Sequence, residues 1–414
     1  MACSERWQVS QSATKARSSG DGHASVAVGI TPPAPMTIGP IPLSLYVHLP
    51  WCIKKCPYCD FNSHAQVGDL PEKAYIDALI GDLEDALPLI WGRSFISVFL
   101  GGGTPNLFSP ESIGLLLDAI RARIRLLPGA EVTIEANPGA AQQGQFEALR
   151  SAGVTRLSLG VQSFDSNLLK AIGRVHDGTQ ALDAARAAVE VFERVNLDLM
   201  YGLPGQDLGQ AQLDLETALA IGPGHVSRYQ LTLEPNTLFS SVPPVLPEED
   251  DIWEMQSCGD TLLAASDYER YEVSAYARAG QVSQHNTNYW TFGDYLGIGA
   301  GSHSKLTLPE RGVIRQTVLR RPEDFMQAVS ARAHRRTESI AAAALPFEFM
   351  LNALRLVNGV PCALYVQRTG QPLESIIEAV GQAQVRGLMS RAAGQLRATP
   401  KGLDFLNDLQ QMFL

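Results

Sequence analysis

The chain has 414 residues, 45% of them hydrophobic, and its 33 Lys and Arg against 43 Asp and Glu give a formal net charge of −10. This length predicts one large domain and a smaller one rather than a single core. An acidic chain without a basic run is not expected to bind nucleic acid. No apolar run approaches the roughly 20 residues that span a bilayer, so we expect at most peripheral membrane contact. The N-terminus lacks a signal-peptide pattern, and we therefore expect a cytoplasmic protein.

The predicted elements begin after residue 40. Residues 1–40 are rich in Ser, Ala, Gly and Pro without periodicity, which predicts a flexible tail that carries no chemistry. From there, short apolar runs alternate with amphipathic ones in about six strand–helix units, which predicts a parallel sheet with right-handed crossovers. Polar residues and glycines recur where the strands end, and this favours a partial (β/α) barrel over a doubly wound sheet. We expect this core to occupy residues 41–270.

Two further regions are predicted beyond the core. Residues 271–339 are aromatic and Gly-rich with little helical period, so we expect added strands and loops there. Residues 340–414 become helical, and a short strand pair near "LRATPKG" predicts a winged-helix-like domain. Such domains often bind DNA, but acidic and basic residues are about equal here. A role in packing or in covering a substrate is therefore expected instead.

The strongest chemical signal is Cys52-x-x-x-Cys56-x-x-Cys59, directly after the first predicted strand. Three thiolates on one loop can bind three irons of a 4Fe-4S cluster and leave the fourth open to a small molecule. Structural zinc is an alternative, but it needs four ligands, so His48 or His64 would have to complete the site. Chance clustering is the other alternative. The remaining cysteines stand alone, and we expect none of them to bind metal: Cys3, Cys258 and Cys362.

A second motif, "GGGTP" at Gly101–Pro105, ends the second predicted strand, where consecutive glycines allow the backbone to approach a ligand closely. Together with "YVHLPWCIKKCPYCDF" it resembles the radical S-adenosylmethionine (SAM) superfamily. Within that superfamily, the chain is similar to the branch of oxygen-independent coproporphyrinogen III oxidase and the HemW-type heme chaperones. The likeness runs from about residue 45 to the C-terminus and includes "GVQSF", "IGRVH", "NLDLMYGLPGQ" and "HNTNYW".

The resemblance implies a 4Fe-4S cluster, an electron donor that reduces it, and a particular way of holding SAM. Tyr58 would pack against the adenine, and Tyr46 would lie near the methionyl end. Gly102, Gly103 and Thr104 would meet the SAM amino group through backbone carbonyls. Four positions near later strand ends match further SAM contacts in the family: Glu135, Gln162, Arg174 and Asp198. A zwitterionic sulfonium ligand does need both acidic and basic partners, although each residue could equally be an ordinary rim residue.

One position departs from the oxidase pattern. Oxidase-type members have a fourth cysteine two residues after the third, associated with decarboxylase activity, and here that position is Phe61. The resemblance to HemW-type chaperones instead implies that the chain binds heme and hands it to apo-hemoproteins of the respiratory chain. Two classes of function remain open: a heme-delivering protein, and an enzyme of porphyrin biosynthesis that uses a SAM-derived radical.

Heme iron needs an axial ligand, and neutral imidazole is the usual one. The candidates are His285 in "HNTNYW" and His303 in "GAGSHS". Tyr289, Trp290 and Phe292 would suit a porphyrin face beside His285, although they would equally suit a hydrophobic core. We take His285 as the predicted heme ligand, with hydrogen bonding alone as the alternative role.

Overall fold

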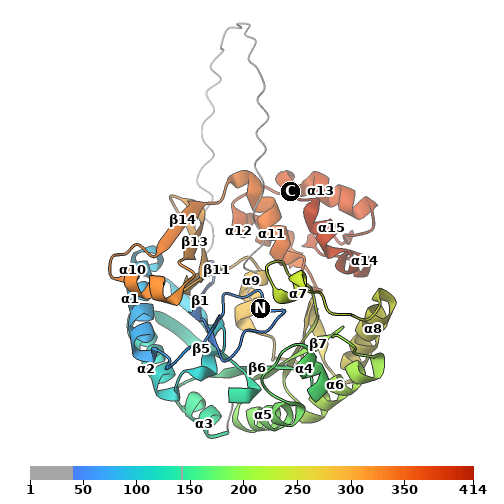
Figure 1. The fold of residues 1–414 in the computed structure, drawn as a ribbon. Helices are drawn as coiled ribbons and strands as arrows, with labels where there is room; N and C mark the ends of the chain where they lie inside the picture. The colour runs from blue at the N-terminus through green and yellow to red at the C-terminus, as the bar shows by residue number, and fades with distance from the viewer. Residues whose placement is uncertain (1–40, 141–142) are drawn as a thin grey trace.

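The computed structural model describes residues 41–140 and 143–414 (Figure 1). The predicted flexible tail, residues 1–40, lies outside the described residues. Within the described ranges, twelve strands form one sheet in the order β14-β13-β12-β11-β1-β4-β5-β6-β7-β8-β10-β9. Six neighbouring strands at its centre run parallel to one another. They are β1 (Leu43–Leu49), β4 (Ser94–Gly102), β5 (Arg125–Ala136), β6 (Arg156–Gln162), β7 (Val195–Tyr201) and β8 (His225–Gln230).

Helices connect these strands and lie around the outside of the curved sheet (Figure 1). They are α1 (Glu72–Ile90), α2 (Pro110–Arg123), α3 (Gln143–Ser151), α4 (Ser166–Ala171), α5 (Gly178–Val191) and α6 (Leu208–Ile221). Side-chain caps fix where two of these helices begin. Asp177 at the start of α5 and Asp207 at the start of α6 each form a capping box with a Gln three residues later. All seven residues of β1 are buried, as expected for a strand covered on both faces. The predicted partial barrel of about six strand–helix units is confirmed.

Antiparallel strands extend the sheet at both edges and make it mixed. On one side β11 (Asp294–Ile298) pairs parallel with β1 and is followed by the antiparallel strands β12 (His303–Leu308), β13 (Gly312–Val318) and β14 (Arg335–Ser339). On the other side β10 (Ala275–Ala277) and β9 (Glu269–Glu272) continue from β8. Further helices of the barrel region are α7 (Leu238–Ser241), α8 (Glu249–Ala265) and α10 (Pro322–Val329), with 3-10 turns η1 (Pro105–Leu107) and η2 (Pro138–Ala140).

Two segments of the predicted strand-and-loop region are helical, α10 and α9 (Gln284–Trp290). The residues of the "HNTNYW" motif lie in α9, so the expectation of a loop here was wrong. The Ser283 side chain caps the helix by accepting from the Asn286 N–H at 3.3 Å. The Glu131 carboxylate accepts from the N–H groups of Gln284 and His285, each at 3.2 Å. These contacts satisfy the free N–H groups of a helix start, and Glu131 comes from β5, far away in the sequence.

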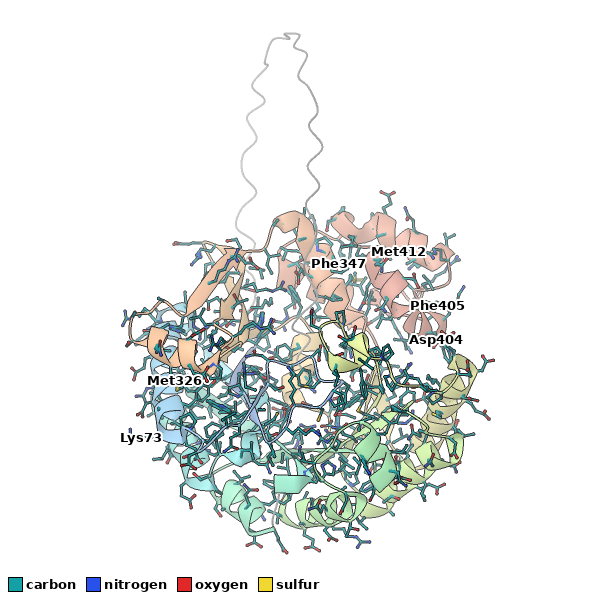
Figure 2. The ribbon with its side chains drawn as sticks, viewed as in Figure 1. Lys73, Met326, Phe347, Asp404, Phe405 and Met412 are labelled. Carbon is teal, nitrogen blue, oxygen red and sulfur yellow. The ribbon has the colours of Figure 1, made fainter. Side chains whose placement is uncertain are left out.

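The C-terminal part is helical and packs on the barrel beside α9. Its elements are η3 (Ala342–Ala344), α11 (Leu345–Ala353), α12 (Cys362–Thr369), α13 (Glu374–Val385), α14 (Pro400–Asp404) and α15 (Leu406–Gln411), with the antiparallel pair β15 (Val360–Pro361) and β16 (Gln395–Leu396). Figure 2 marks Phe347, Phe405 and Met412 on this part. Its core also includes Trp290 and Phe292 of the barrel region. Among the described residues, no helix is long and apolar enough to cross a membrane.

Candidate functional site

The cysteine loop is fastened to the carboxyl edge of the parallel sheet. It leaves β1 and is flanked by a short parallel pair, β2 (Trp51–Cys52) and β3 (His64–Ala65). The Gly103 N–H donates to the Leu49 carbonyl at 2.8 Å, and the Thr104 N–H donates to the Trp51 carbonyl at 2.7 Å. The end of β4 thus holds the start of the loop. This arrangement brings the two sequence motifs, the cysteines and the glycines, side by side.

The three thiols of the loop line one cavity of about 290 Å³. They are free and partly buried, and burial raises the pKa of the Cys52 and Cys59 thiols. The Arg174 guanidinium lies 3.7 Å from the Cys56 sulfur. Within residues 41–140 and 143–414, no three His, Cys, Asp or Glu side chains converge as the ligands of a single ion do. A cubane cluster does not need such convergence, because each thiolate binds a different iron.

Most of the residues predicted to contact SAM line the same cavity as the cysteines. They are Tyr58, Gly102, Gly103, Thr104, Glu135, Gln162, Arg174 and Asp198. Tyr46 is the exception, because its side chain lines a neighbouring cavity, where its hydroxyl lies 3.0 Å from the His48 Nδ1 atom. The structure therefore gathers residues from six different strands and loops around the thiols. Their roles toward SAM stay predictions.

The charged groups of the cysteine cavity are partly unsatisfied. The Glu135 carboxylate accepts one hydrogen bond, from the Gly102 N–H at 3.0 Å, and burial raises the pKa of the Glu135 and Asp198 carboxyls. Arg174 donates from Nη2 to the Gly160 carbonyl at 2.7 Å, while its buried Nε atom has no hydrogen-bond partner among the described residues. Partly buried groups of both signs, one with an unused donor, fit a polar ligand that carries both charges.

The glycines of the second motif are required by the protein itself. Gly102 has a φ of +116°, and a Cβ atom added there would lie 2.5 Å from the His48 ring. A Cβ atom at Gly103 would lie 2.4 Å from the Trp51 carbonyl oxygen. The close approach that the glycines allow is thus between the ends of β1 and β4.

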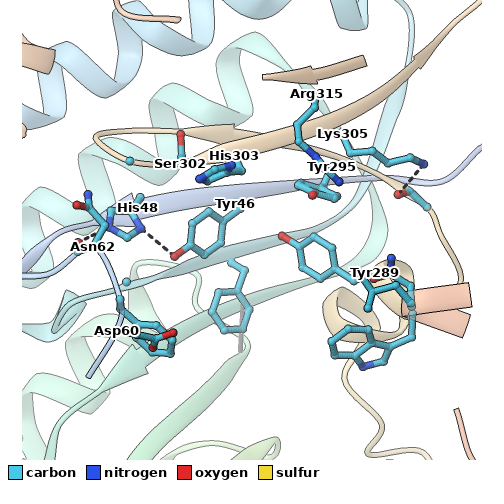
Figure 3. A pocket seen from close by; sticks show the side chains of 18 of the residues that line it. Tyr46, His48, Asp60, Asn62, Tyr289, Tyr295, Ser302, His303, Lys305 and Arg315 are labelled. Atoms are coloured by element: carbon cyan, nitrogen blue, oxygen red, sulfur yellow. Dashed lines mark hydrogen bonds between the residues drawn. The ribbon is translucent and has the colours of Figure 1, made fainter. Parts of the chain in front are cut away.

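A second cavity, of about 200 Å³, adjoins the first (Figure 3). We call it the aromatic cavity, because rings form much of its wall: Tyr46, Phe99, Tyr289, Trp290, Phe292 and Tyr295. The two cavities share wall residues at the end of the cysteine loop and across from it: Asp60, Phe61, Gly102, Glu135 and Glu234. Phe61, at the position where oxidase-type members have cysteine, therefore lies between the two cavities.

The two histidines of the aromatic cavity differ in their partners. His48 is bonded at both ring nitrogens, to the Tyr46 hydroxyl at 3.0 Å and to the Asn62 carbonyl at 2.9 Å, and burial lowers its pKa to about 4. His303, whose pKa is also lowered by burial, has no hydrogen bond on its ring from any described residue. Both rings are marked in Figure 3.

His285, the predicted heme ligand, lines neither cavity. Its Nδ1 atom lies 2.8 Å from the Ser97 hydroxyl and its Nε2 atom lies 3.2 Å from the Tyr289 hydroxyl. The ring packs 4.9 Å from the Phe99 ring, and burial lowers the pKa of His285 to about 3. Ligation of heme iron by His285 stays a prediction, and it requires at least one of these hydrogen bonds to break.

Several residues of the site were not singled out from the sequence. Tyr229 lies near the end of β8, lines the cysteine cavity and donates its hydroxyl to the Gln162 side-chain oxygen at 2.8 Å. Its position at a strand end was a signal that could have found it. Arg315 and Tyr295 line the aromatic cavity from the added strands, and no motif in the sequence marks them.

Comparison with known proteins agrees with this fold. The family described as the Radical SAM superfamily matches residues 46–217, and the HemN C-terminal domain matches residues 340–405. The protein named heme chaperone HemW of Escherichia coli (strain K12) is 45% identical over 374 residues, which cover 90% of this chain and 98% of that protein. Radical S-adenosyl methionine domain-containing protein 1, mitochondrial, of Bos taurus is 36% identical over 381 residues, 88% of this chain and 86% of that one.

A solved structure shares the fold over almost its full length. The coproporphyrinogen III oxidase HemN of Escherichia coli, described as a radical SAM enzyme, superposes with a TM-score of 0.76 at 21% identity, covering 91% of each chain. The partial barrel, its cysteine loop and the matched family define a radical SAM protein. Within that superfamily, the chain belongs to the HemW family, because its identity to the Escherichia coli protein extends over nearly that protein's entire length.

Proposed function

We propose that this chain is a heme chaperone, which binds heme and delivers it to apo-hemoproteins. The observation that carries the proposal is the 45% identity over 98% of a protein named heme chaperone HemW. The aromatic cavity supports it, because flat apolar cargo is best bound by a concave wall of rings with a few polar groups.

The cysteine cavity would hold the cofactors. Cys52, Cys56 and Cys59 would bind a 4Fe-4S cluster, which supplies an iron open to the polar groups of SAM. Arg174 and the carboxyls of Glu135 and Asp198 would hold the charged groups of SAM, since they line the same cavity. Thiolate ligands need a reducing compartment, so we place the protein in the cytoplasm. As recipients we propose apo-hemoproteins of the respiratory chain, and a reducing electron donor as a further partner.

Phe61 favours the chaperone over the oxidase. The fold likeness to HemN would permit a coproporphyrinogen oxidase, the second candidate function. A phenylalanine, however, has neither a titratable proton nor a metal-binding atom, and so it cannot replace the cysteine of oxidase-type members. Phe61 is 37% exposed and borders both cavities, so a residue at this position could reach a ligand in either.

The test is anaerobic reconstitution of the full chain with iron and sulfide, followed by two separate assays. We expect hemin to produce a Soret band that saturates, and the band to move to an added apo-hemoprotein. We expect no conversion of coproporphyrinogen III to protoporphyrinogen IX in the presence of SAM and an electron donor. Conversion without heme binding would replace the chaperone by the oxidase. Failure of both assays in a protein with a complete cluster would refute both.

A further inference from the structure

We propose that the heme lies in the aromatic cavity and that His303, rather than His285, is its axial ligand. The inference rests on the proposed heme binding and deepens it by naming the binding site. An axial nitrogen must have its lone pair free and must point into a space that can hold the porphyrin.

His303 stands apart from the other histidines. Within residues 41–140 and 143–414, it alone has neither ring nitrogen in a hydrogen bond. The histidines with at least one bonded nitrogen are His48, His64, His176, His225, His285 and His334. The ring of His303 is partly buried, and both of its nitrogens are available to a ligand. Its ring borders a cavity, where an iron atom would supply the missing partner.

Neighbouring residues of β11, β12 and β13 line the aromatic cavity together with His303. His303 and Lys305 are two residues apart on β12, so they project from the same face of the sheet. Lys305 is opposite Arg315 on β13 and opposite Tyr295 on β11. All four line the aromatic cavity. A flat ring system bound through His303 would therefore lie at the His303 end of this face, beside the place where the Tyr289 ring of α9 packs 4.5 Å from the Tyr295 ring (Figure 3).

Arg315 provides a partner for a heme propionate. Its Nη2 atom donates to Glu348 at 2.8 Å, which uses one of the five N–H donors of the guanidinium. Its side chain is 27% exposed, which allows it to meet a carboxylate at the mouth of the cavity. Lys305 is not suited to this role, because its buried ammonium already donates to Asp294 at 3.0 Å and to two backbone carbonyls.

Other ligands in the cavity are less suitable. The hydroxyls of Tyr46 and Tyr289 each contact a histidine nitrogen, and burial raises the pKa of both phenols, which disfavours the phenolate that binds iron. Ligation by His303 alone also suits a protein that must release its cargo, because a single iron–nitrogen bond has to be exchanged.

The experiment titrates hemin into the reconstituted full chain and its variants, with iron and sulfide content measured in each. We expect His303→Ala to weaken heme binding by at least about tenfold, and free imidazole to restore the parent's Soret band. His303→Cys should bind heme with the spectrum of a thiolate ligand, a change that a structural role would not produce. His285→Ala is the matched comparison and should keep the parent's spectrum.

Each outcome decides between the proposals. If His303→Ala and His303→Cys both keep the parent's Soret band and affinity, the inference is overturned while heme binding stands. If His285→Ala alone loses the band, His285 is the ligand. If His303→Ala does not fold, as a lost cluster would reveal, the spectrum of His303→Cys decides. If the parent itself binds no heme, the proposed function fails instead.

Discussion

The thiols of Cys52, Cys56 and Cys59 share one cavity, whereas the other described cysteines lie elsewhere. The Cys258 sulfur lies 3.9 Å from the Gln212 side chain, and Cys362 begins α12 in the C-terminal part. We expect replacement of the three loop cysteines together by Ala to abolish iron and sulfide binding on reconstitution. Iron and sulfide analysis measures this. The controls Cys258→Ala and Cys362→Ala should keep full iron content, and full retention in the triple variant would exclude the loop as the cluster site.

Gly102 provides a second prediction at the residue scale. Because its φ is +116° and a Cβ would meet the His48 ring at 2.5 Å, Gly102→Ala should strain the backbone and displace His48. We expect the free energy of unfolding to fall by about 1–3 kcal/mol, measured by urea denaturation. Gly144→Ala in α3 is the control, since no atom lies within 4 Å of an added Cβ there and the helix should gain up to about 1 kcal/mol. Equal stability of Gly102→Ala and the parent would contradict the packing argument.

Some site residues could be predicted from the sequence because the chain itself brings them together. The cysteines share one short loop, and the "GGGTP" motif begins in the last residues of a neighbouring strand. Tyr229 and Arg315 come from distant strands, so only the strand order places them beside the site. The free nitrogens of His303 and the occupied nitrogens of His285 depend on side-chain partners that no sequence pattern records.

At the scale of elements, local periodicity decided what was predictable. The parallel strands and their helices follow from alternating runs with caps inside the same segment, such as Asp177 at the start of α5. Helix α9 has only seven residues, too few to show a period, and its start depends on Glu131 from β5. The added strands were expected. It was not expected that β11 pairs with β1 and so joins the added strands to the sheet, because pairing between distant segments leaves no local signal.

Helix α6 is fastened to the turn after β6 by a buried carboxylate, and this contact predicts a pH dependence. Asp214 accepts from the Ser163 hydroxyl at 2.7 Å and from the Phe164 N–H, yet burial, with the charge of Asp165 nearby, raises its pKa from 3.8 to about 6. The folded state therefore binds this proton more tightly than the unfolded state. Its contribution to stability is greatest below about pH 4 and is lost as the pH rises to about 6.

The variant Asp214→Asn keeps an acceptor for the Phe164 N–H and removes the titration. We expect it to be more stable than the parent at pH 7, by about 1–3 kcal/mol, and to match the parent near pH 4. Urea denaturation at pH 4.5, 5.5 and 7 measures the difference. Asp118→Asn, at a carboxylate that is 78% exposed, is the control. A difference between Asp214→Asn and the parent that does not change with pH would contradict the assignment.

At the scale of the whole molecule, the barrel and the C-terminal part share a hydrophobic core. Tyr271, Trp290 and Phe292 of the barrel region pack in one cluster with Phe349 and Leu354 of the C-terminal part. The backbone connects the two regions as well: the Val273 N–H donates to the Arg355 carbonyl, and the Val357 N–H donates to the Tyr271 carbonyl. The shared core lies beside the aromatic cavity, because Trp290 and Phe292 belong to both. Stability of the C-terminal part should therefore influence ligand binding.

This shared core predicts that the two regions unfold together. Phe349 is fully buried, with its ring 5.7 Å from the Phe292 ring and 5.2 Å from the Tyr365 ring. Because Phe349→Ala leaves a cavity in the shared core, we expect a loss of about 3–5 kcal/mol. Calorimetry should show one transition, shifted as a whole to lower temperature. Phe405→Ala, at a ring that is 51% exposed, is the control and should shift it much less (Figure 2). A separate early transition of the C-terminal part, with the barrel's transition unmoved, would show instead that the two regions are energetically independent.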